Sequence, residues 1–163
     1  MYENDFKEKR LKLLNEYISN NKTAAAGMII ARICIYSILV PRAILTLWEI
    51  FFFIYKGTPL NLIGPAFFIT LLPTLHMMFY AHKRIAYVTL ATPIIRLLLY
   101  FPLLHPVVGG DALGDTYPFI LFTVMSLQFV ASLIILTGHS CDIYYIGIKR
   151  INKKLQKEFA KKP

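Results

Sequence analysis

Residues 24–56 read AAAGMIIARICIYSILVPRAILTLWEIFFFIYK, an apolar run of 33 residues that ends in Lys56. Inside the run lie three further charged residues, Arg32, Arg42 and Glu49, and one proline, Pro41. As a single helix the run would be about 50 Å long at about 1.5 Å per residue, whereas the hydrocarbon core of a bilayer is about 30 Å thick. The run therefore predicts a membrane helix that is longer than the membrane and that carries charges in need of partners.

The composition of the whole chain also indicates a membrane protein. Hydrophobic residues make up 56% of the 163 positions and charged residues 17%, whereas a soluble domain carries about 25% charged residues. The mean hydropathy is +0.54. The net charge of +9 would suggest nucleic acid if it lay on a soluble face. Because its distribution follows the predicted membrane threading instead, no nucleic-acid partner is expected.

Pro41 decides how the long run is divided. Proline removes a backbone hydrogen bond and disfavours helical geometry in the residue before it, so a kink or a break is expected there. The favoured interpretation is one long kinked helix over 24–56, whose membrane part is about 34–55. The alternative is two short spans that turn at Pro41.

Three further apolar segments and two amphipathic segments complete the predicted fold. The further spans are about 60–80, 85–104 and 117–137. An amphipathic helix at 2–20 is expected on the membrane surface or packed against the protein's own loops, and 138–160 forms a basic amphipathic tail. The expected fold is a single all-α integral membrane domain over 1–163. It is a bundle of four transmembrane helices, with five as the alternative, and it has surface helices at both ends.

The loops predict an orientation. The short 81–84 loop and the tail are basic, whereas the 105–116 loop has two acids and no basic residue. Because basic residues stay on the inner side of the membrane, four spans with both termini inside fit this pattern. The sequence leaves open the bacterial cytoplasmic membrane and the mitochondrial inner membrane.

Three charged residues lie inside the predicted spans, namely Arg42, Glu49 and Arg96. Each such charge costs at least about 2.5–3.5 kcal/mol at the centre of a membrane helix. Arg42 and Glu49 share one side of their helix but lie about 10 Å apart along it, so each needs a group on another helix. A Glu49–Arg96 ion pair is the simplest pairing. It would either fix the helix packing or line a polar pathway, and the arginine pair could attract an anion or a lipid phosphate.

Two other sets of polar residues are candidates for contacts. Gln128 and Ser132 are one helical turn apart, and such residues hydrogen-bond between membrane helices, so they predict a helix-packing face. The tail carries five basic residues that predict docking to anionic lipid or to an acidic partner: Lys149, Arg150, Lys153, Lys154 and Lys157.

No cofactor, metal or catalytic site is expected. His76 and His139 fall toward the same membrane side and could ligate haem, but the sequence lacks a glycine-lined helix pair for the macrocycle. The segment from His139 to Asp142 contains nucleophile residue types, but neighbours on a helix point about 100° apart. No histidine–carboxylate cluster has metal-site spacing.

The favoured function is a non-catalytic integral membrane subunit of a larger membrane assembly, with a helix-packing or scaffold role. Its partners would be the lipid bilayer and other membrane subunits or copies of itself. A first alternative is a small homo-oligomeric channel or pore lined by Arg42, Glu49 and Arg96. A second is a membrane enzyme or carrier that handles lipid or quinone.

Overall fold

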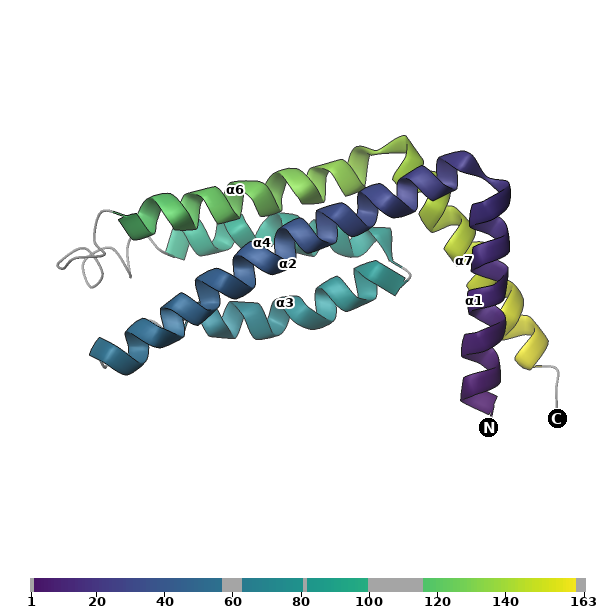
Figure 1. Ribbon diagram of the computed structural model, residues 1–163, viewed down its shortest axis with the longest axis horizontal. Coiled ribbons are helices and arrows are strands. Elements are labelled where there is room, and N and C mark those ends of the chain that lie inside the picture. Colours follow the sequence, from purple (N-terminus) through teal and green to yellow (C-terminus); the bar gives the residue numbers. More distant parts are fainter. Residues whose placement is uncertain (1, 57–62, 81, 100–115, 161–163) are drawn as a thin grey trace.

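The computed structural model describes residues 2–56, 63–80, 82–99 and 116–160. Within these ranges the protein is entirely helical, which confirms the predicted all-α class for this part of the chain. The elements are α1 (Tyr2–Asn20), α2 (Lys22–Lys56), α3 (Ile63–Tyr80), the 3₁₀ helix η2 (Lys83–Ile85), α4 (Ala86–Leu99), α6 (Thr116–Thr137) and α7 (His139–Phe159). Helices α2, α3, α4 and α6 run along the long axis of the molecule, while α1 and α7 stand across one end of it (Figure 1).

Helix α2 is the central element, because it contacts α1, α3, α6 and α7. Pro41 lies inside this helix and does not end it. The alternative prediction of two short spans that turn at Pro41 is therefore wrong. The helix begins at Lys22, two residues before the apolar run. Asn21 caps it, since its side-chain Oδ1 accepts a hydrogen bond from the Ala24 backbone N–H at 3.0 Å.

Two helical segments of the described chain are long and apolar enough to cross a membrane, Lys22–Phe51 and Tyr117–Thr137. The apolar segment Gly64–Phe79 of α3 is shorter. Helix α4 has 14 residues, and at about 1.5 Å per residue it covers about 21 Å, less than the roughly 30 Å of the hydrocarbon core. The predicted second and third spans also included residues 60–62 and 100–104, which lie outside the described residues.

Helices α1 and α7 form an antiparallel pair (Figure 1). Near their far end, the rings of Phe6 and Phe159 meet edge to face with centroids 5.3 Å apart. Nearer the bundle, the Tyr17 hydroxyl donates to the Ile143 carbonyl at 3.0 Å, and the Tyr17 ring covers Gly147. The two predicted surface helices therefore cover each other's apolar sides. Helix α1 thus packs on α7, a helix of its own chain and not a loop.

Helix α7 also packs closely on the start of α2. Gly27 is buried there, and a Cβ atom at this position would collide with the backbone of Ser140 and Cys141. At the same end of the bundle, Lys83 Nζ donates to Asp142 Oδ1 at 2.5 Å. This ion pair joins the basic 81–84 loop to the first turn of α7. The loop and the tail therefore share one end of the bundle, as the predicted orientation requires.

The interior contains two apolar clusters. The larger one joins α2, α3, α6 and α7 and includes Ile35, Ile38, Leu75, Met78 and Ile135. The smaller one joins α2 and α6 and consists of the buried residues Leu45, Leu121, Val124 and Met125. Buried polar and charged side chains accompany these clusters, among them Arg42, Glu49, Arg96 and Gln128.

We predict that Gly27→Ala destabilises the protein by about 1–3 kcal/mol, the usual cost of overpacking. The added methyl group would meet backbone atoms of α7, which cannot rotate away as a side chain can. Unfolding in mixed detergent micelles measures the change. Ala26→Leu is the control, because Ala26 is the exposed neighbour. Alanine favours helix by up to about 1 kcal/mol over glycine, so without a collision Gly27→Ala would leave the stability unchanged or raise it. That result would contradict the close contact.

Candidate functional site

A buried ion pair joins α2 to α4. Arg96 Nη2 donates to Glu49 Oε1, and the two side chains are 2% and 4% exposed. Tyr117, in the first turn of α6, donates its hydroxyl to the same Oε1 atom at 2.6 Å. Arg96 Nη2 also lies 3.4 Å from the Tyr117 hydroxyl oxygen. The predicted Glu49–Arg96 pair is therefore present, and it connects three helices through one carboxylate oxygen.

Gly64 makes room for this pair on α3. The Glu49 carboxylate occupies the space in which a Cβ atom at position 64 would lie, with Oε2 as the nearest atom. Any side chain at this position would therefore displace the carboxylate from Arg96 and Tyr117. Gly64 lies inside the predicted span 60–80, and no sequence pattern marks it as the glycine that faces a carboxylate on another helix. The sequence analysis missed Tyr117 because an aromatic residue at a span end reads as an interfacial anchor.

Arg42 is the second buried cation, and it is 2% exposed. Its Nη2 donates to the Gly64 carbonyl oxygen at 3.2 Å, so Arg42 links α2 to α3. Arg42 and Glu49 both reach α3 at Gly64, and Glu49 is also bonded to α4 and α6. Gly64 therefore touches both: its carbonyl meets Arg42, and its missing side chain admits Glu49.

A hydrogen-bonded layer joins α4 to α6. Gln128 Nε2 donates to the Thr89 carbonyl at 2.8 Å and to Thr92 Oγ1 at 2.7 Å. The Ser132 and Thr89 hydroxyl oxygens are 2.8 Å apart. Gln128 and Ser132 thus lie on a packing face. Sequence analysis overlooked their partners on α4, although Thr89, Thr92 and Arg96 lie at helical spacing and could have marked this face.

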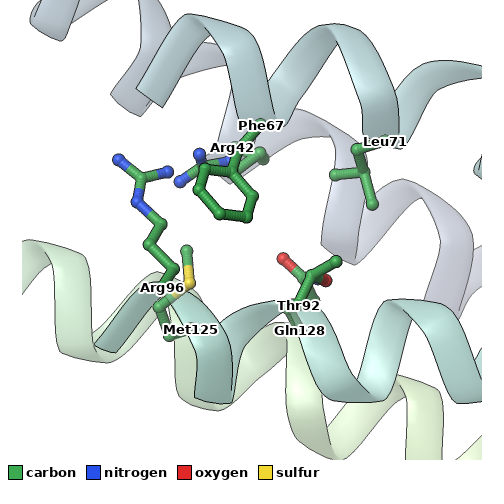
Figure 2. Close-up of a pocket in the computed structure, with 7 residues that line it drawn as sticks. All are labelled: Arg42, Phe67, Leu71, Thr92, Arg96, Met125 and Gln128. Atoms are coloured by element: carbon green, nitrogen blue, oxygen red, sulfur yellow. The ribbon is translucent and has the colours of Figure 1, made fainter. Parts of the chain in front are cut away.

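A small pocket lies between the ion pair and this layer (Figure 2). It is lined by Arg42, Phe67, Leu71, Thr92, Arg96, Met125 and Gln128. Its volume is about 10 Å³, which is room for roughly one water molecule. A lipid chain or a quinone ring needs a far larger cavity. The pocket therefore suits only a very small ligand.

The basic residues of α7 lie on its exposed side. Lys149, Arg150, Lys153, Lys154 and Lys157 are all exposed. The apolar side of α7 is buried inside the protein, where Ile148 and Leu155 are 2% and 0% exposed. An amphipathic helix that lies in a membrane inserts its apolar side. Because most of that side is covered in this protein, α7 offers a partner mainly its polar, basic side, together with the half-exposed Ile146.

The other residues with reactive side chains, His76, His139 and Cys141, do not form one site. His76 lies in α3 and His139 begins α7, and both side chains are exposed. Cys141 is fully buried, burial raises the pKa of its thiol, and its Sγ lies 3.7 Å from the Gly27 carbonyl oxygen. A protonated, enclosed thiol is a poor nucleophile. Among the described residues, no group of three His, Cys, Asp or Glu side chains could hold a metal ion.

Tyr145 fastens α7 to the bundle. Its hydroxyl donates to the Met78 carbonyl at 2.8 Å, and burial raises the pKa of the phenol above its ordinary value. Met78 belongs to α3, close to the 81–84 loop. The start of α7 is thus bonded to α3 as well as to η2.

Comparisons with known proteins identify no relative. No protein-family model matches the chain, and no curated protein or solved structure is significantly similar to it. The site must therefore be interpreted from its own geometry.

We predict that Glu49→Gln and Arg96→Met each destabilise the protein by about 3–5 kcal/mol, the cost of leaving one partner of a buried ion pair uncompensated. The double variant should lose no more than either single variant, because neither charge is then left without its partner. Unfolding in mixed micelles gives the four values of this double-mutant cycle. Strictly additive losses would show that the two residues are not coupled.

We predict that Gln128→Leu costs about 1 kcal/mol, the usual scale of a hydrogen bond between membrane helices. The substitution removes both hydrogen bonds that Gln128 donates to α4, and it introduces an apolar side chain of similar size. Thr123→Val on the exposed side of α6 is the control and should change stability by less than about 0.5 kcal/mol. Equal losses for the two variants would contradict a packing role specific to Gln128.

Proposed function

We propose that this protein is a non-catalytic integral membrane subunit of a larger membrane assembly. In this proposal α2, α3, α4 and α6 form a four-helix transmembrane bundle. The distribution of polarity supports it: large apolar side chains on the outside of the bundle are exposed, such as Leu47 at 67%, Leu98 at 68% and Phe119 at 75%. Soluble monomers rarely leave extended apolar patches uncovered. Lipid would cover these side chains.

The contacts of the buried charged residues support a scaffold role over a pore. Glu49, Arg96 and Tyr117 are bonded to one another inside a single chain, and Arg42 is bonded to α3. Each contact joins two helices of the same bundle. A homo-oligomeric pore lined by these residues would need them to face a shared axis between copies. Their burial within one protomer therefore supports a packing role over the pore.

The α1–α7 pair supports a docking role at the inner membrane surface. It stands across the end of the bundle (Figure 1). If the bundle axis follows the membrane normal, the pair lies parallel to the membrane plane. It then presents the exposed basic residues of α7 to an acidic surface of another subunit or to anionic lipid headgroups, as either would attract them. The bacterial cytoplasmic membrane and the mitochondrial inner membrane both fit this proposal.

Cysteine labelling tests the threading. In a variant that lacks Cys34 and Cys141, single cysteines replace Lys12, Asp111 or Lys153. An impermeant maleimide added to intact cells or mitoplasts should label only Asp111→Cys, since the other two positions are expected inside. Permeabilisation should expose all three. Labelling of Lys12→Cys from outside would contradict the arrangement of four spans with both ends inside.

Native mass spectrometry in a mild detergent tests the assembly. The wild-type chain should be found as a single copy with unrelated chains. Replacing Lys149, Arg150, Lys153, Lys154 and Lys157 by glutamine should release most of those chains, while stability stays within about 0.5 kcal/mol per exposed position. Lys12→Gln with Lys22→Gln is the control for net charge. A ring of identical copies without other chains would contradict the subunit proposal and favour the pore.

A further inference from the structure

The buried charges of the described bundle do not balance. Two arginines and one glutamate are buried there, and all three side chains are at most 4% exposed. Glu49 Oε1 accepts from Arg96 and Tyr117, while Glu49 Oε2 is buried and makes no hydrogen bond to the described residues. Arg42 instead meets a neutral carbonyl, that of Gly64. The interior of the described bundle therefore holds one positive charge more than its carboxylate neutralises.

Several nitrogen atoms of the two arginines lack an acceptor. Arg42 Nη1, Arg96 Nε and Arg96 Nη1 are buried and make no hydrogen bond to the described residues. Buried polar groups normally find a partner, and charged ones are costly without it. Arg42 and Arg96 both line the small pocket, and their guanidinium groups lie at the same end of it (Figure 2).

The remaining residues that line the pocket are uncharged. Thr92 and Gln128 contribute neutral polar groups, and Phe67, Leu71 and Met125 contribute apolar ones. No carboxylate is part of this lining among the described residues. A volume of about 10 Å³ admits a group about the size of a water molecule, so the pocket fits a monoatomic ion.

We infer that the pocket between Arg42 and Arg96 binds one small monovalent anion of halide size. The anion accepts hydrogen bonds from the guanidinium nitrogens that have no other acceptor, and it neutralises the second arginine. It thereby holds α2 and α4 together beside the Glu49–Arg96 pair. This inference is independent of the proposed assembly role, because it concerns the interior of a single chain.

Thermal unfolding of the purified full-length protein in detergent tests the inference. Titration with sodium chloride at constant ionic strength, balanced with sodium gluconate, should raise the unfolding midpoint and reach saturation, and bromide should replace chloride. Gluconate and inorganic phosphate should give no saturable rise because they exceed the size of the pocket. A rise with phosphate and not with chloride, or an equal rise with every salt, would overturn the inference.

Variants assign the response to the pocket. Arg42→Gln should raise the half-saturating chloride concentration about tenfold or more, as expected for the loss of a charged hydrogen-bond donor. Arg42→Lys keeps the charge and should retain part of the response. Arg32→Gln is the matched control on the same helix, since Arg32 is exposed, and it should respond as the wild type does. An Arg42→Gln protein with an unchanged chloride response would overturn the assignment.

A direct measurement covers the case in which Arg42→Gln does not fold. The chloride-35 NMR line should broaden in the presence of the wild-type protein and of Arg32→Gln, and bromide should reverse the broadening. The Arg42→Lys variant should broaden it less. Absence of bromide-reversible broadening with the folded wild type would overturn the inference.

Discussion

The carboxylate of Glu49 is the point on which the helix bundle depends. One of its oxygens accepts from Arg96 on α4 and from Tyr117 on α6, and its other oxygen fills the space beside Gly64 on α3. In an apolar environment a buried charge without a partner is strongly unfavourable, so these contacts specify which helices must be neighbours. Apolar contacts alone would be less selective, because they have no preferred direction.

Around this carboxylate the bundle alternates polar and apolar layers. Gln128 with Thr89 and Thr92 joins α4 to α6 by hydrogen bonds. Beyond that layer, the larger apolar cluster continues into α7 and includes Cys141 and Tyr144. The polar layers fix how far each helix is shifted along its neighbours. The apolar clusters fill the space between the polar layers. The two surface helices extend the same architecture past the end of the bundle.

The sequence was informative about elements and about which charges must be paired, because hydrophobic periodicity and the cost of charge in lipid act locally. It gave the ranges of α1, α2 and α6 to within two residues, and the Glu49–Arg96 pair. It favoured one long helix across Pro41, which the structure has, but it left a turn there open, since whether neighbouring helices hold a helix from which proline has removed one bond is not written in the sequence. It also missed Gly64 and the α1–α7 pair, because both depend on where another helix lies.

The pairing of the first helix with the last has a consequence for how the chain is made. Lys9 and Glu158, which are bonded across this pair at 2.6 Å, are 149 positions apart in the sequence. At about 5–20 residues per second, the ribosome needs roughly 7–30 s to reach α7 after it has made α1. During that time α1 can contact α2 but not α7. The contact between α1 and α7 can therefore form only after α7 has been translated.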